Sequence, residues 1–300
     1  MSVRGSHYVA GTILCVASLV ACQPIDRAHV VEVTARDYTF EVTGEIPSGW
    51  TTFRMKNEGN EHHFFLLTRL PEGTTFEEYV EEAGVAFETA WDSLRTGEMD
   101  QAEAGQLLGG LLPEWYATVT PMGGTGLVAA GGVAQTSLNL DPGNYVMECY
   151  VKTRDGIFHT TLGMARPFTV TQERSGASEP EADLEVVLSN YEVAITGETT
   201  AGEHTVAVRF EEHPEFGLGN DVHLARMKDG VDLNEVARWM DWMELSGLLA
   251  PAPAEFLGGA QEMPIGHTAY FTVHLEPGRY GWLTEASPDK RMFKEFTIER

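Results

Sequence analysis

Short segments in which apolar and polar residues alternate recur along the chain and predict β-strands. The first two are 31–34, Val-Glu-Val-Thr, and 51–56, Thr-Thr-Phe-Arg-Met-Lys. Two more, 137–140 and 145–151, flank a Pro-Gly turn. Alternation with a period of two places the apolar side chains on one face of a strand, where they can form the core of a sandwich. The sequence therefore predicts a mostly β protein.

Many of these segments occur twice. Residues 31–54 and 184–209 share Val, Tyr, Thr-Gly and Gly at positions that are offset by 153. The turn Leu-Asp-Pro-Gly-Asn-Tyr at 140–145 has a counterpart, Leu-Glu-Pro-Gly-Arg-Tyr, at 275–280. Self-similarity of this kind predicts that one folding unit is present in two copies.

We expect the two copies to be tandem domains at 29–171 and 184–300. The polar segment 172–183 between them contains Arg-Ser-Gly-Ala-Ser-Glu-Pro-Glu, which is typical of an exposed linker. Each domain also contains an insertion with helical periodicity, opening at 74–77, Thr-Thr-Phe-Glu, and at 232–235, Asp-Leu-Asn-Glu. The prediction is two tandem Greek-key β-sandwiches, each with an inserted helical segment.

Composition excludes several classes of protein. The 300 residues include 45 acidic and 20 basic ones, for a net charge of -25. Clustered Lys and Arg are needed to bind phosphates, so we expect no nucleic-acid partner. With 43% hydrophobic residues the chain is too apolar for a disordered acidic protein. The stretch 123–126, Gly-Gly-Thr-Gly, lacks the Lys of a phosphate-binding loop, and we interpret it as a turn.

The N-terminus has the order of an export signal. Arg4 precedes the apolar stretch 8–21, which is shorter than the ~20 residues that span a bilayer. Its end, Leu-Val-Ala followed by Cys22, resembles the lipobox of bacterial lipoproteins. The resemblance implies that 1–21 is a signal peptide and that Cys22 is lipidated. An uncleaved N-terminal membrane anchor is the alternative, and in both cases we expect a membrane-anchored, extracytoplasmic protein, in the periplasm or at the cell surface.

Three cysteines are present, and they have different predicted fates. Cys15 lies inside the export signal and Cys22 at the lipidation site, so Cys149 is the one side-chain thiol left in the mature chain. A solitary thiol in an oxidising compartment is expected to be buried or bound to a metal.

The residues near Cys149 suit a metal site. His159 and Met164 follow it before the closing strand, and His62 and His63 begin an upstream strand. Thiolate, imidazole and thioether ligands together favour a soft or borderline metal. Two His, one Cys and a weak axial Met constitute the ligand set of a type 1 copper site.

These motifs resemble the cupredoxin family, the plastocyanin- and azurin-like blue copper proteins. Family features are Asn-x-Gly before the first His, and a Gly-x-Tyr strand that leads to Cys, His and Met before the last strand. The matching residues are Asn57-Glu58-Gly59, His63, Gly143-Asn144-Tyr145, Cys149, His159 and Met164. The resemblance covers nearly all of 30–171.

The resemblance implies one type 1 copper ion, bound in the first domain only. His63, Cys149 and His159 would be its equatorial ligands and Met164 its axial ligand, with His62 as the alternative first ligand. The nine residues between Cys149 and His159 make this loop longer than in the small carriers.

The second domain lacks the equivalent ligands. Alignment of the Pro-Gly turns places Thr284 where Cys149 stands, and alignment of the earlier strands places Asn220 opposite His63. His223 falls on the other face of that strand, and we interpret it as a surface or packed residue rather than a ligand.

The leading functional prediction is one-electron transfer by a carrier, not an enzyme. Multicopper oxidases place His on both sides of the copper Cys and copper nitrite reductases place one beside it, whereas Cys149 is flanked by Glu148 and Tyr150. We expect the partner to be a membrane-bound redox complex or a cytochrome with a basic surface, with lipid contact through the N-terminal anchor. One alternative is a metal-free cupredoxin-like scaffold, an accessory subunit docked on the periplasmic face of a membrane electron-transfer complex. Another is copper delivery or storage.

Overall fold

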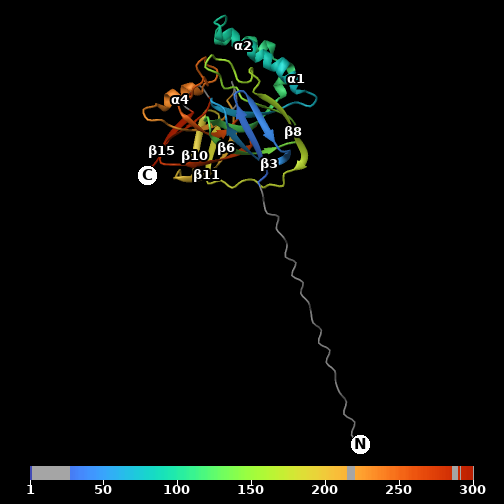
Figure 1. The fold of residues 1–300 in the computed structure, drawn as a ribbon, viewed down its shortest axis with the longest axis vertical. Coiled ribbons are helices and arrows are strands. Elements are labelled where there is room, and N and C mark those ends of the chain that lie inside the picture. The colour runs from blue at the N-terminus through green and yellow to red at the C-terminus, as the bar shows by residue number, and fades with distance from the viewer. Residues whose placement is uncertain (2–27, 215–219, 286–289, 291, 300) are drawn as a thin grey trace.

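The described part of the chain is a two-layered β-structure with helices at one end (Figure 1). The computed structural model describes Met1, 28–214, 220–285, 290 and 292–299. The predicted signal segment, with Cys15 and Cys22, lies outside the described residues. No helix in the described ranges has the length and apolarity needed to cross a bilayer.

Eight strands form the first sheet, in the order β2-β1-β3-β6-β14-β11-β9-β10. Their bounds are β1 Val30–Arg36, β2 Thr39–Thr43, β3 Ile46–Asn57, β6 Val133–Leu140, β9 Leu184–Ser189, β10 Glu192–Thr196, β11 Gly202–Glu212 and β14 Thr268–Leu275. In β1 the side chains of Val31, Val33 and Ala35 are buried, and the alternating Glu32 is exposed. This is the period of two from which the strand was predicted.

The second sheet has the order β8-β7-β4-β5-β13-β12-β15-β16. Its strands are β4 His63–Arg69, β5 Thr120–Val128, β7 Gly143–Glu148, β8 Ala165–Arg174, β12 Val222–Arg226, β13 Glu255–Ala260, β15 Gly278–Leu283 and β16 Phe293–Ile298. The start of β3 pairs in parallel with β8 and so joins the two sheets. One cluster of buried apolar side chains, drawn from both sheets, forms the core. The prediction of a mostly β sandwich is confirmed.

Both sheets run continuously through the two halves of the chain. In the first sheet β6 pairs with β14, with Thr136 opposite Phe271. In the second sheet β5 pairs with β13, with Val128 opposite Leu257. The halves are therefore hydrogen-bonded edge to edge in both layers, and the edges that a separate domain would expose are covered.

Helices interrupt each half, as predicted. In the first half they are α1 Phe76–Glu78, the π-helix η1 Tyr79–Gly84, α2 Val85–Arg95, α3 Gln101–Leu111 and the 3-10 helix η2 Glu114–Thr118. The capping box uses Thr75 and Glu78, one residue later than the predicted pattern. In the second half Asp232 caps α4, Leu233–Met240. Figure 1 places α1, α2 and α4 at the same end of the sandwich.

Two local predictions are wrong. The stretch 123–126 is not a turn but the buried middle of β5, where glycine is required because neighbouring strands approach closely. A Cβ atom on Gly124 would lie 1.8 Å from the carbonyl oxygen of Phe65, and Gly124 has a φ of +159°. The strand predicted at 145–151 ends at Glu148, so Cys149 is the first residue after β7.

Candidate metal centre

Three predicted ligands, His63, Cys149 and His159, converge at one end of the first half. His63 opens β4, and Cys149 follows β7, which pairs with β4. The Cys149 Sγ atom lies 3.8 Å from His63 Nδ1 and 3.6 Å from His159 Nδ1. Three donors placed ~2.1 Å from a common centre in a trigonal plane lie ~3.6 Å apart, so the spacing fits one ion.

Carboxylates fix both histidines with their lone pairs facing the sulfur. His63 Nε2 lies 2.7 Å from Asp37 Oδ1, and His159 Nε2 lies 2.8 Å from Glu61 Oε2. A carboxylate can only accept, so each Nε2 carries the proton and each Nδ1 keeps a free lone pair. This is the tautomer that a metal needs, and carboxylate partners of this kind orient metal-binding histidines in proteins.

Burial favours the neutral forms of His63 and Cys149 when no metal is bound. His63, Cys149 and His159 are all 0% exposed. Burial, followed by the neighbouring His159, lowers the pKa of His63 to about 4. Burial also raises the pKa of the Cys149 thiol to about 12. A metal ion would therefore displace the thiol proton on binding.

The Asn57-x-Gly59 motif shapes the loop that carries these partners. Asn57 Nδ2 donates to the backbone carbonyl of Glu61, and Asn57 Oδ1 accepts from the Gly59 amide. A Cβ atom on Gly59 would lie 2.3 Å from Asp37 Oδ1 and 2.7 Å from His63 Nε2. Only glycine leaves room for the Asp37–His63 hydrogen bond.

Met164 lies next to the cluster through its backbone. The Cys149 amide donates to the Met164 carbonyl at 3.1 Å, and the Met164 amide donates to the His159 carbonyl at 2.9 Å. The Met164 side chain is fully buried. The backbone of Met164 therefore lies directly beside two of the three converging residues.

His62 points away from the three converging donors. Its ring packs against Phe256 and Trp239, at centroid distances of 5.7 and 6.4 Å. Both partners belong to the second half of the chain. Burial lowers the pKa of His62 to about 4. The structure brings His63, and not His62, into the cluster.

The long loop between Cys149 and His159 is a small folded unit. An isolated bridge pairs Lys152 with Phe158, and the His159 amide donates to the Val151 carbonyl at 2.8 Å. The Lys152 ammonium nitrogen reaches the second half, where it donates to the carbonyls of Trp242 and Glu244 at 2.9 and 2.6 Å. The long loop, which contains the predicted ligand His159, is thus attached to the second half through Lys152.

In the second half, the side chains at the positions equivalent to His63 and Cys149 hydrogen-bond to backbone carbonyls. The pairing of Arg69 with Tyr145 corresponds to that of Arg226 with Tyr280, so Asn220 stands where His63 stands in the first half. Asn220 Nδ2 donates to the backbone carbonyls of Asn190 and Glu212. Thr284, at the position of Cys149, donates to the Met292 carbonyl.

A second group of titratable side chains was missed by the sequence analysis. Asp221, His223 and Glu285 offer donor atoms within 4.8 Å of one another, and all three are buried. His223 is therefore a member of a polar cluster and not an isolated packed residue. Two features signalled it: Asp221 and His223 are two residues apart at the start of β12, so their side chains lie on the same side of the chain, and β12 pairs with β15, which Glu285 follows closely.

The second group has the opposite proton arrangement from the first. The Leu127 amide donates to His223 Nδ1 at 2.9 Å, so that lone pair is occupied and the ring proton lies on Nε2. Nε2 faces Asp221 Oδ2 at 3.1 Å and Glu285 Oε1 at 3.3 Å. A metal at Nε2 would have to remove this proton and leave the ring with a negative charge or break the Leu127 hydrogen bond. This cluster therefore fits a proton better than a metal.

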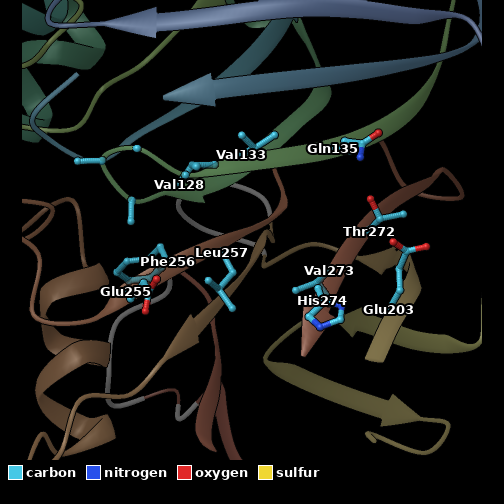
Figure 2. A pocket seen from close by; sticks show the side chains of 14 residues that line it. Val128, Val133, Gln135, Glu203, Glu255, Phe256, Leu257, Thr272, Val273 and His274 are labelled. Carbon is cyan, nitrogen blue, oxygen red and sulfur yellow. The ribbon is translucent and has the colours of Figure 1, made fainter. Parts of the chain in front are cut away.

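A groove of about 480 Å³ follows the junction of the two halves (Figure 2). Val128 and Val133 line it from the first half, and Phe256, Leu257 and His274 from the second. In the described ranges, the groups of three side chains able to hold a metal are the two clusters above, and neither lies in this groove. The groove carries no comparable chemistry.

Comparison with known proteins gives matches only among solved structures. No protein-family model and no curated protein matches the chain. Auracyanin from the photosynthetic bacterium Roseiflexus castenholzii is 19% identical, and the match covers 48% of this chain and 98% of that one, with a TM-score of 0.29. Auracyanin A, a blue copper protein of Chloroflexus aurantiacus, is 14% identical over 48% of this chain and 100% of its own, with a TM-score of 0.30. A multicopper oxidase is 13% identical over 91% of this chain and 89% of its own, with a TM-score of 0.23.

Proposed function

We propose that the chain is a cupredoxin-like electron carrier that binds one copper ion, in its first half only. His63, Cys149 and His159 would be the equatorial ligands and Met164 the axial one. Bound copper would supply a couple between Cu(I) and Cu(II), which this ligand set supports in electron-transfer proteins.

The main observation that supports the proposal is the direction of the imidazole lone pairs. In the first cluster both Nδ1 lone pairs face Cys149 Sγ, because Asp37 and Glu61 hold the protons on the far side of each ring. In the second cluster the His223 proton points inward. A type 1 copper ion is thus expected at the first cluster and not at the second.

Burial of the donors favours electron transfer over copper delivery. A delivery site must expose its ligands to an acceptor, whereas all three donors here are 0% exposed. Hydrogen bonds also hold each ring in place, so both oxidation states would meet the same ligand positions. The Glu61 carboxylate bonds to His159 Nε2, and 21% of the Glu61 side chain is exposed. This residue would therefore give an electron a short route between His159 and the surface.

The remaining parts of the proposal concern partners and location. Cys149 is flanked by Glu148 and Tyr150 and not by His, so we assign the chain no oxidase or nitrite reductase activity. We propose an extracytoplasmic protein that is anchored to a membrane by its N-terminus and exchanges electrons with a membrane-bound redox complex or a cytochrome. The formal charge of -25 favours a partner with a basic surface.

One specific observation supports the scaffold as second candidate. The second half keeps the sandwich although Asn220 and Thr284 occupy the ligand positions, so this fold persists without a metal. Under this alternative the whole chain would be an accessory subunit that binds no copper.

Copper loading separates the two candidates. Purified protein that takes up one equivalent of Cu(II) should show an intense thiolate charge-transfer band, and Cys149→Ser should abolish it. His63→Ala should abolish the band as well, whereas the neighbouring His62→Ala is the matched control and should keep it. Stoichiometric copper binding without the band, or no binding, would refute the carrier and favour the scaffold.

A further inference from the structure

The second cluster is connected to the metal centre through Tyr150, the residue that follows Cys149. The Tyr150 hydroxyl donates to Glu285 Oε2 at 3.1 Å. The Glu285 amide in turn donates to Asp221 Oδ1 at 2.8 Å. One peptide unit, one phenol side chain and one hydrogen bond therefore join the predicted copper ligand to a buried carboxyl group of the other half.

The hydrogen bonds of the cluster leave one oxygen atom unmatched. Asp221 accepts from His223 Nε2 and from the Glu285 amide, and Glu285 Oε2 accepts from Tyr150. Glu285 Oε1 lies 3.3 Å from His223 Nε2, whose proton is donated to Asp221, and it makes no hydrogen bond of its own although the residue is only 8% exposed. A proton on Oε1 would remove the charge of this carboxyl group, which lies in one cluster with the Asp221 carboxylate.

The ring of His223 cannot supply the missing proton. The two carboxylates favour a second proton on this ring, but it would have to sit on Nδ1, against the N–H of Leu127. Two buried carboxylates beside a neutral ring would leave an uncompensated charge. Protonation of Glu285 leaves one charge in the cluster, on Asp221, which accepts from His223 Nε2 and from the Glu285 amide.

The surroundings of Glu285 agree with this assignment. Burial, followed by the Asp221 charge, raises the pKa of Glu285 to about 7. Asp221, His223 and Tyr150 face the carboxyl group directly, and Lys152 and Cys149 interact with it at longer range. A cavity of about 490 Å³ reaches Asp221 and Glu285, so protons can be exchanged with water. The other charged residues that line it are Glu88, Glu148, Asp241, Glu244, Glu262 and Lys290.

We propose that Glu285 is a proton-binding site that couples electron transfer at Cys149 to proton uptake. The inference rests on the proposed copper site. In the copper-loaded protein, reduction by an external one-electron donor would add one negative charge to the interior. One proton would then pass from solvent in the cavity to Glu285 Oε1 and form an O–H bond, which would restore the charge of the interior. Reoxidation would release the electron to an external acceptor and the proton to solvent.

Infrared titration of the metal-free protein tests the proton site without copper. The protein should show the C=O stretch of a protonated carboxyl group that is lost as the pH rises through about 7. Glu285→Gln should remove this band, whereas Glu148→Gln, at a half-buried carboxyl group, should remove a different one. If Glu285→Gln removes no band, Glu285 is ionised and the inference is overturned.

The reduction potential of the copper-loaded protein tests the coupling. In the wild type it should fall as the pH rises through about 7, with a slope approaching one proton per electron, and Glu285→Gln should lose most of this slope. Asp221→Asn is the second variant if Glu285→Gln does not fold, and it should move the slope to lower pH. Glu203→Gln, in the distant groove, should leave the slope unchanged.

Other outcomes overturn the inference. A flat wild-type potential, or an unchanged slope in both variants, would show that no proton at this cluster follows the electron. Stoichiometric binding of Zn²⁺ or Mn²⁺ that is lost in Glu285→Gln would show a metal site instead. Failure of copper to bind would refute the proposed function, while the infrared titration would still decide whether Glu285 holds a proton.

Discussion

The hydrogen bond between Glu61 and His159 gives the most informative prediction about copper affinity. The Oε2 to Nε2 distance is 2.8 Å, the acceptor is charged, and the His159 ring is 0% exposed. Charge-assisted bonds of this length are about twice as strong as neutral ones. Loss of such a partner of a metal-binding histidine typically costs about 10–100-fold in metal affinity.

Two substitutions separate the charge from the hydrogen bond. Glu61→Gln keeps an oxygen that accepts from Nε2, so copper affinity should fall by roughly tenfold, or about 1.4 kcal/mol. Glu61→Ala leaves a buried N–H without a partner and frees the ring to adopt the tautomer with its proton on Nδ1, toward Cys149. Its affinity should fall by roughly 100-fold, or about 2.7 kcal/mol.

Competition with a chromophoric Cu(I) chelator measures these affinities. Glu58→Gln is the matched control, because Glu58 is a nearby carboxylate that pairs with Arg36 and Lys56 and touches no predicted ligand. An unchanged affinity in Glu61→Ala, or an equal loss in Glu58→Gln, would show that the carboxylate does not select the ring tautomer.

Two further predictions concern stability. Gly124→Ala should lower the free energy of unfolding by at least ~3 kcal/mol in a urea titration, because its Cβ would overlap the Phe65 carbonyl. Gly105→Ala, in open space on α3, is the control and should be neutral or stabilising. Equal effects of the two substitutions would contradict the close strand approach described for β5. Burial raises the pKa of Glu148 to about 7, above its unfolded value of about 4.5, so its proton stabilises the fold at acidic pH and this contribution is lost as the pH rises toward 7. In Glu148→Gln the decline in stability between these pH values, followed by urea unfolding, should be smaller by on the order of 3 kcal/mol, and an unchanged decline would show that Glu148 is ionised throughout.

The strands and the three converging ligands could be predicted because their signals are local. Alternation of apolar residues marks a strand, His63 and Cys149 stand directly at strand ends, and His159 lies in the loop before the closing strand. The carboxylate partners could not be predicted in this way. Asp37 and Glu61 resemble the many other surface acids of the chain until the loop at Gly59 brings them to the ring nitrogens.

The wrong prediction of a turn at 123–126 and the missed second cluster both arise from contacts between segments that are distant in sequence. The glycines at 123–126 looked like a turn because the composition of a segment does not reveal which backbone passes beside it. The second cluster combines Asp221 and His223, at the start of β12, with Glu285, which lies just after β15, and Tyr150 from the other half hydrogen-bonds to Glu285. Contacts that depend on how two halves pair are not encoded in either half alone.

The continuous sheets also determine how the two halves of the chain are related to each other. At the β6–β14 junction the pairs Ser137–Tyr270 and Gln135–Thr272 exchange places when the halves are exchanged, which is the relation found in a two-fold symmetric dimer. The two halves thus pair as the subunits of such a dimer do, and because they belong to one chain their pairing does not depend on protein concentration. The second half, with Asn220 and Thr284 at the equivalent positions, still covers strand edges of the first half and contributes Glu285 to the cluster beside Tyr150.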